Sequence, residues 1–203
     1  MIAKGCLNWI LIPMILFFLF LIIFYNNSLI ILVLFPLICI NIFCLIFFRD
    51  PERTIGEGIV SPADGIIREI IIEQEQVFIS IFMKVTNVHV NRMPIDGIIT
   101  EMKHFPGKHI RAYKKESEHN EKVTIDIDSP IGKVIVIQIA GLVARRINPY
   151  IKKGDKLRKG DRIGIIRFGS RVDIFLPANK IKNVTVKIKD RVYASVTTIA
   201  EIK

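Results

Sequence analysis

The amino-acid sequence lacks charged residues over a long N-terminal stretch. No Asp, Glu, Lys or Arg occurs between Leu7 and Phe48, whereas all 19 acidic and all but one of the 29 basic residues follow Phe48. The hydrophobic fraction of 51% is high for a soluble protein, so part of the apolar content is expected to serve a membrane. Residues 1–48 are therefore expected to form a membrane anchor, and residues 49–203 a separate domain.

The uncharged stretch contains two apolar runs, Leu7–Tyr25 and Leu29–Phe48, separated by a polar turn. Each approaches the ~20 residues that a helix needs to cross a bilayer, which predicts a transmembrane helical hairpin. A signal peptide is the alternative, but these runs exceed its apolar core of ~7–15 residues and no small-x-small cleavage site closes them. Because Lys4 precedes the first run and Arg49 and Arg53 follow the second, the domain is expected at the cell membrane, facing the cytoplasm.

Cysteine is absent from residues 49–203, since Cys6, Cys39 and Cys44 are the three in the chain. This absence excludes a disulfide framework in the domain. The net charge of +10, less Lys4, leaves +9 on the domain, which predicts attraction to an anionic membrane surface. No nucleic-acid partner is expected, because aromatic residues do not interleave with the basic ones.

Helical periodicity is also absent after Gly58. Short β-branched runs alternate with turns marked by Gly, Pro and Asp, which predicts a mainly β (α+β) domain, barrel-like or a sandwich. The expected strands are Ile66–Ile72, Val77–Met83, Ile98–Met102, Lys122–Ile127, Lys133–Ala140, Arg162–Arg167, Val172–Leu176 and Asn183–Ile188. Lys108–Glu121 is expected to be an exposed loop or short helix, and two Lys-Gly-Asp turns within residues 151–166 are expected to be structural.

Two chemical signatures are missing. No histidine or cysteine spacing indicates a metal site, and the G-x-S-x-G elbow of many serine hydrolases does not occur. What remains is Ser170 in a Gly-Ser turn between two expected strands, Asp64 in a turn, and His89 in an apolar run. Serine, histidine and aspartate together indicate an activated hydroxyl, in which His89 takes the proton and Asp64 orients the imidazole.

Five phrases, SPADGII, NVHVNRMPIDG, FPGKHIRAYKKESEHNE, QIAGLVARRI and RFGSRVDIFLP, resemble in the same order the blocks of the short form of phosphatidylserine decarboxylase. The resemblance runs from about Arg49 to Pro177. In that family the serine of the Gly-Ser pair attacks the preceding carbonyl in an N-to-O acyl shift. Elimination from the ester and hydrolysis then leave an N-terminal pyruvoyl group and ammonia.

Carried to this chain, the resemblance implies cleavage between Gly169 and Ser170, giving a β chain 1–169 and an α chain 170–203 that stay together as a heterodimer or a higher oligomer. Ser170 would become the covalent pyruvoyl cofactor, and no external cofactor would be needed. Its ketone would form a Schiff base with the amine of phosphatidylserine or archaetidylserine and accept electrons as carbon dioxide leaves. Asp64 and His89 match the family's proton-moving positions.

One position departs from the family pattern. Longer members carry two histidines in the second block, and Arg92 stands here where the second would be. His89 is therefore expected to serve both self-cleavage and decarboxylation. Candidate ligands of the lipid phosphate are Arg145, Arg146, Lys108 and Arg111, because Arg and Lys bind phosphate oxygens.

Two other functions remain open from the sequence. The Lys-Gly-Asp turns resemble lipoyl- and biotinyl-type domains, which would make the chain a membrane-anchored carrier or transport adaptor. Such a carrier needs a modifiable lysine at a hairpin tip beside methionine, and Lys84, after Met83, is expected inside a strand instead. A serine hydrolase acting at the membrane is the weaker alternative.

Overall fold

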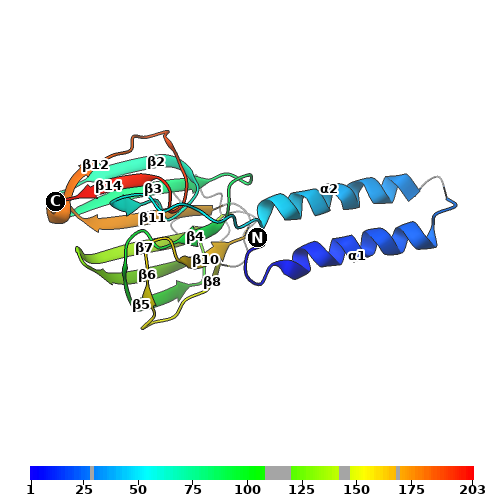
Figure 1. Cartoon of the computed structure of the whole chain (residues 1–203), viewed down its shortest axis with the longest axis horizontal. Helices are drawn as coiled ribbons and strands as arrows, with labels where there is room; N and C mark the ends of the chain where they lie inside the picture. Colours follow the sequence, from blue (N-terminus) through cyan, green and yellow to red (C-terminus); the bar gives the residue numbers. More distant parts are fainter. Residues whose placement is uncertain (28–29, 108–119, 142–146, 168–169) are drawn as a thin grey trace. The chain divides into compact units, whose positions relative to one another are not determined.

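The computed structural model describes residues 1–27, 30–107, 120–141, 147–167 and 170–203. The chain divides into two compact units, Met1–Glu52 and Arg53–Lys203 (Figure 1). Each unit has its own secondary structure, helical in the first and almost entirely β in the second.

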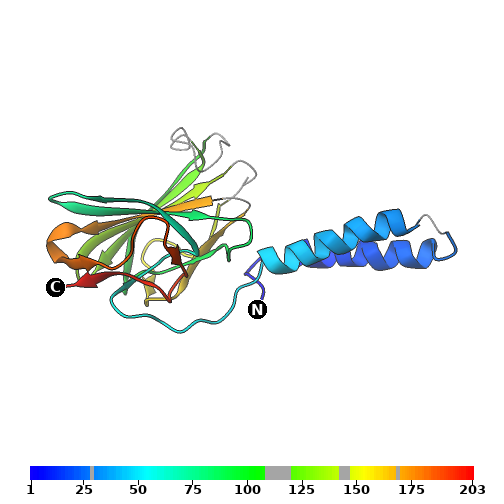
Figure 2. The ribbon, with the colours of Figure 1, turned by 90° about the horizontal axis from the view of Figure 1, so that it is seen from above.

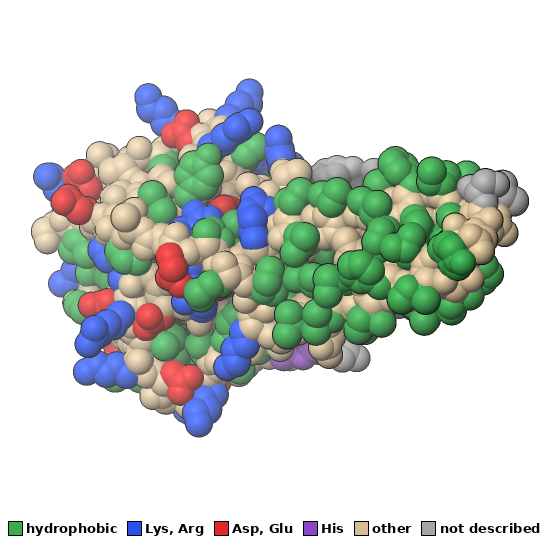
Figure 3. All heavy atoms as spheres, turned by 45° about the vertical axis from the view of Figure 1, so that its right-hand side comes forward, with side chains coloured by type: hydrophobic (Ala, Val, Ile, Leu, Met, Phe, Trp, Pro, Cys, Tyr) green, Lys and Arg blue, Asp and Glu red, His purple; other side chains and the backbone are tan. Residues whose placement is uncertain are grey.

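The first unit is a pair of helices, α1 (Leu7–Ile23) and α2 (Ile31–Phe47), of 17 residues each. They lie antiparallel and pack against each other (Figure 1). Most of their large apolar side chains remain exposed, and Figure 3 shows these side chains covering the surface of this unit. None of the helices in the described part of the chain combines the length and the apolar character that a membrane crossing requires.

Within its described residues, the second unit contains strands β1 to β14 and one 3₁₀ turn, η3 (Ala178–Lys180). The strands are β1 (Ile59–Val60), β2 (Gly65–Ile72), β3 (Gln76–Met83), β4 (Val90–Arg92), β5 (Gly97–Phe105), β6 (Lys122–Ser129), β7 (Gly132–Ala140), β8 (Ile147–Pro149), β9 (Lys156–Leu157), β10 (Arg162–Ile166), β11 (Ser170–Pro177), β12 (Ile181–Val184), β13 (Arg191–Val192) and β14 (Thr198–Ile202). They form an eight-stranded sheet in the order β13-β2-β3-β11-β7-β6-β5-β9, and two three-stranded sheets, β1-β14-β12 and β4-β10-β8.

The core lies on one face of the large sheet and is shared with the small sheets. Alternate residues of β11, Val172, Ile174 and Leu176, are buried there, together with Ile163 of β10 and Ile199 of β14. Figure 2 shows the strands of this unit from above. The mainly β prediction is confirmed. Within the described residues β13 and β9 are the two edges of an open sheet, which fits a sandwich better than a closed barrel.

Strand β11 is central in the large sheet. It pairs antiparallel with β3 on one side, where Val172 lies opposite Ile81, and with β7 on the other, where Val172 lies opposite Gln138. Both backbone edges of β11 are therefore bonded over most of its length.

All eight expected strands are present, although the last is wrong in four of its six residues, since β12 ends at Val184. The two Lys-Gly-Asp turns are tight turns. The backbone N of Lys152 donates to Asp155 Oδ2 (2.9 Å), and the backbone N of Arg158 donates to Asp161 Oδ2 (2.7 Å). Each aspartate thus holds the residue three positions before it.

Candidate active site

Four neighbouring strands of the large sheet have ends that lie side by side. Ser170 lies among these strand ends, and this line of strand ends, which is not an edge strand, is called the edge. Ser170 begins β11 and lies opposite both Met83, which ends β3, and Ala140, which ends β7. The next strand, β6, begins at this edge too, because Lys122 lies opposite Ile139. Two of the five sequence blocks that carry the family resemblance, QIAGLVARRI and RFGSRVDIFLP, therefore meet at this edge.

Ser170 is completely buried at this edge. Because side chains alternate along a strand, its side chain lies on the core face with Val172. The hydroxyl Oγ donates to the sulfur Sδ of Met83 at 3.1 Å. A thioether is a weak acceptor and cannot take the proton, so a base for Ser170 must come from elsewhere.

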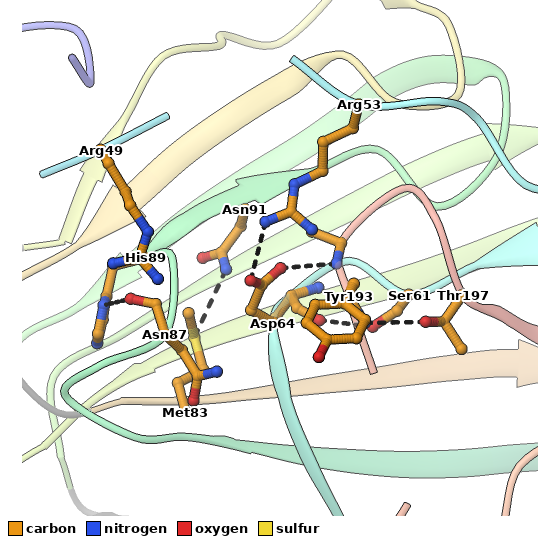
Figure 4. Close-up of polar contacts among 12 residues, drawn as sticks. Arg49, Arg53, Ser61, Asp64, Met83, Asn87, His89, Asn91, Tyr193 and Thr197 are labelled. Carbon is orange, nitrogen blue, oxygen red and sulfur yellow. Dashed lines mark hydrogen bonds and ion pairs between the residues drawn. The ribbon is translucent and has the colours of Figure 1, made fainter. Parts of the chain in front are cut away.

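Asp64 directly precedes β2 and is buried, as the SPADG turn predicts. Its Oδ2 accepts from Arg53 Nη2 at 2.9 Å, and its Oδ1 accepts from the backbone N of Ala194 at 2.8 Å (Figure 4). The Arg53 guanidinium also lies 6.0 Å from the ring centre of Tyr193. In the described residues the carboxylate is thus held by Arg53 and Ala194, and not by His89.

His89 is fully buried just before β4. Its Nδ1 lies 2.9 Å from the carbonyl oxygen of Asn87, and because a carbonyl only accepts, Nδ1 must carry a proton (Figure 4). In the neutral ring, Nε2 is then the basic atom.

The backbone places His89 near the same end of the fold as Ser170. The carbonyl oxygen of His89 accepts from the backbone N of Ile166 at 3.3 Å. Ile166 ends β10, and four residue steps from it to Ser170 span at most about 14 Å. The fold therefore brings Ser170 and His89 into one region, and sets Asp64 at the start of a neighbouring strand pair.

Arg92 occupies the position of the missing second histidine. Its side chain is buried, and Nη1 donates to the carbonyl oxygen of Gly160 at 3.3 Å. Arg92 thus joins β4 to the second Lys-Gly-Asp turn.

The sequence did not predict a second pair of acid and base groups near this edge. Glu121 is buried, and its Oε1 lies 2.9 Å from Nε2 of His104. The carbonyl oxygen of Glu121 accepts from the backbone N of Ala140, the residue opposite Ser170. The expected strand Ile98–Met102 was too short, because β5 continues to Phe105 and carries His104. No alternation marks this extension, because Lys103 and His104 are both polar; pairing with β6 carries the strand on to Phe105.

Several sequence predictions lie outside the described residues. These are Gly169 and the four phosphate candidates, Arg145, Arg146, Lys108 and Arg111. Within the described ranges, no group of three or more His, Cys, Asp or Glu residues could hold a metal ion.

The expected position of Lys84 is wrong. Strand β3 ends at Met83, and Lys84 is exposed at the start of a turn in which its backbone N donates to Asn87 Oδ1 at 2.8 Å. The expected strand Val77–Met83 ends at the same residue as β3, and Lys84 was placed inside a strand only because Val85 continues the apolar run. The carrier alternative therefore has to be judged by relatives rather than by this lysine.

Comparison with known proteins gives one answer. The family model described as phosphatidylserine decarboxylase matches residues 40–200. A phosphatidylserine decarboxylase proenzyme of Streptomyces avermitilis is 49% identical over 155 residues, covering 75% of this chain and 71% of its own. One from Polynucleobacter asymbioticus is 43% identical over 179 residues, covering 82% and 81%.

A third relative, from Methanococcoides burtonii, is provisionally named an archaetidylserine decarboxylase proenzyme. It is 38% identical over 208 residues, covering 100% of this chain and 97% of its own.

Proposed function

The chain belongs to the phosphatidylserine decarboxylase family and is an enzyme of that type, and on this premise we propose that it processes itself at Gly169–Ser170 and then decarboxylates a phosphoserine lipid. The product would be the corresponding phosphoethanolamine lipid and carbon dioxide. The observation that carries the proposal is the position of Ser170, buried at the end of a central strand in the region of His89.

Self-processing assigns specific work to Ser170. Its Oγ attacks the carbonyl carbon of Gly169, the peptide C–N bond breaks, and an ester forms while the amine of Ser170 is released. Loss of the Ser170 α proton then breaks the bond from Cβ to the ester oxygen, which leaves with Gly169 as its C-terminal carboxylate, and the resulting dehydroalanine is converted by water to a ketone and ammonia. The Nε2 of His89 is the candidate base, because Nδ1 already donates to Asn87.

A pyruvoyl group fits the surroundings of Ser170. The group is small and uncharged, and it suits a fully buried position beside a thioether. A ketone there supplies an electron sink for the departure of carbon dioxide. The chain's own residues then exclude water from it, since Met83, Ala140 and Val172 around Ser170 are all buried.

The lipid nature of the substrate suggests a role for the first unit. We place α1 and α2 in the cell membrane as the anchor of the enzyme, with the β-rich unit on the cytoplasmic side. Support comes from the exposed apolar side chains of both helices and from the excess of Lys and Arg after Phe48. Arg145, Arg146, Lys108 and Arg111 stay the candidate ligands of the lipid phosphate.

Replacement of Ser170 tests self-processing. Intact mass should show two pieces in the unmodified protein, whereas Ser170→Ala should stay at the full 23.2 kDa. Ser195→Ala is the matched control, because Ser195 is also fully buried and its hydroxyl has no hydrogen-bond partner among the described residues. Cleavage of Ser170→Ala at the same bond would refute the proposal.

The lipid is tested by parallel assays of labelled phosphatidylserine and archaetidylserine. Both are plausible substrates because the reacting headgroup is the same. Release of labelled carbon dioxide from neither lipid by the cut protein would contradict the decarboxylase proposal.

A further inference from the structure

A buried chain of polar contacts leads from Ser170 into the core. Ser170 Oγ donates to Met83 Sδ at 3.1 Å, and Asn91 Nδ2 donates to the same sulfur at 3.7 Å (Figure 4 shows the second contact). Gln138 Nε2 donates to Asn91 Oδ1 at 2.7 Å. All four side chains are fully buried, and they come from β11, β3, β4 and β7.

The contacts have a consistent direction. Gln138 uses its NH₂ group on Asn91 Oδ1, so the NH₂ group of Asn91 faces Met83. The sulfur of Met83 thus receives two donors, one from Asn91 and one from Ser170. Methionine has three rotatable side-chain bonds, and a second contact is what holds its sulfur in place.

Stability does not explain this chain of contacts. Burying an amide costs free energy unless all its groups are bonded, and Gln138 Oε1 has no partner among the described residues. Leucine or methionine would fill the same space without that cost. The neighbouring strand β10 also leaves room for the amide, because a Cβ on Gly164 would lie 3.2 Å from Gln138 Nε2.

We propose that Asn91 and Gln138 are positioning residues for self-cleavage, acting through the sulfur of Met83 on the hydroxyl of Ser170. This inference rests on the proposed function. A hydroxyl that points its hydrogen at sulfur keeps its oxygen lone pairs available for the adjacent carbonyl carbon. Because sulfur is a weak acceptor, the contact fixes the side-chain rotamer without holding the proton against a base.

Met83 gives the sharpest test, because two substitutions separate packing from hydrogen bonding. Met83→Leu keeps volume but removes the acceptor, and should slow the appearance of cut protein by about tenfold. Met83→Gln restores an acceptor of similar length and should recover part of the rate, because its amide oxygen fixes the rotamer but holds the hydroxyl proton more tightly than sulfur does. Pulse-labelled precursor, followed by gel electrophoresis, measures each rate.

Stability should follow the opposite order. In a Ser170→Ala background, where every variant stays uncut, Met83→Leu should melt close to the parent and Met83→Gln lower. The matched control is Met93→Leu, since Met93 is equally buried in the core and, among the described residues, its side chain makes no hydrogen bond to Ser170, Asn91 or Gln138. In a chain that keeps Ser170, Met93→Leu should be cut at the same rate as the protein without substitutions.

Asn91→Leu and Gln138→Leu should each slow cutting, and neither should slow it further when added to Met83→Leu, because all three act on one hydroxyl. Independent, multiplying effects would overturn the inference. So would equal rates for Met83→Leu and Met93→Leu, or a Met83→Gln rate no higher than that of Met83→Leu.

Failure of the two proposals can be told apart. If the unmodified chain is not cut before Ser170, the proposed function fails. If it is cut and the Met83, Asn91 and Gln138 variants are cut at the same rate, only the positioning role fails.

Discussion

Asp173 lies three residues after Ser170 on β11 and faces away from the core, yet it is buried. Its Oδ1 accepts from Ser80 Oγ at 2.7 Å, and its Oδ2 pairs with Arg171 at 2.9 Å. Burial nevertheless raises the pKa of the Asp173 carboxyl above its ordinary value of 3.8, because lost hydration outweighs the attraction of Arg171 and the hydrogen bond from Ser80. The ionised carboxylate is thus disfavoured in the folded protein.

This shift predicts a pH dependence of stability. A carboxyl whose pKa is raised by folding binds protons more readily in the folded state, so stability falls as pH rises from the ordinary value through the raised one. Unfolding temperatures of the unmodified protein and Asp173→Asn should therefore converge or cross on acidification. Between neutral pH and about pH 4, the unfolding temperature of the protein without substitutions should rise relative to that of Asp173→Asn.

Comparison with a variant cancels the general effects of acid, and Asp128→Asn, at an exposed aspartate of β6, is the matched control. If the unfolding temperature of Asp173→Asn instead rises relative to that of the protein without substitutions as pH falls, the ion pair with Arg171 affects the Asp173 carboxyl more than burial does.

At the level of single residues, the sequence singles out Ser170, Asp64 and His89 as candidates but does not indicate their partners. Asp64 binds Arg53 and the backbone of Ala194, the latter 130 positions away in the sequence. Such pairs depend on how distant strands meet, and no local pattern encodes them.

At the level of elements, three turns share one geometry. The aspartates of the two Lys-Gly-Asp turns and Asp190 each accept from the backbone N three residues earlier, which for Asp190 is that of Lys187 at 2.8 Å. The residue before each aspartate has a positive φ, of 92° at Gly154 and Gly160 and 78° at Lys189. In the third turn a lysine therefore adopts a conformation that suits glycine.

Lys189→Gly should stabilise the protein by about 0.5–1 kcal/mol, because relief of the left-handed strain exceeds the added freedom of the unfolded chain. Urea unfolding measures the change. Lys189→Ala keeps the strain and removes the long side chain, so it should give no comparable gain. Equal stability of the glycine and alanine variants would contradict the argument.

The long strands were predictable because each is a run rich in β-branched residues, and turn residues separate one run from the next. The short ones were not. Strand β4, Val90–Arg92, forms only because β10 lies beside it, with Val90 opposite Ile165. A strand of this length has little propensity of its own, and pairing with a distant segment decides it.

At the level of the whole molecule, the two units differ in the surface that they expose. Large apolar side chains cover the helical unit, whereas Lys and Arg side chains are spread over the β-rich unit (Figure 3). Adsorption through charge and insertion through apolar side chains would both bring the chain to a membrane, but they respond differently to salt.

The full chain should therefore stay on vesicles containing anionic lipid after a wash in about 1 M salt, where the screening length is only about 3 Å. Arginine at two exposed apolar positions, Ile15→Arg with Ile40→Arg, should cause its release. Release of the unmodified chain by salt alone would show that charge, and not the helices, holds it.

The central position of β11 has a consequence for folding. In the uncut chain, β11 finds β3 and β7 as parts of one molecule, so folding is unimolecular. If the bond before Ser170 is broken, as proposed, a denatured sample holds two separate polypeptides, and β11 can pair with β3 and β7 again only after the two polypeptides collide. Refolding of the cut protein then depends on protein concentration. The lifetime of its folded state is set by the rate of unfolding rather than by the rate of refolding.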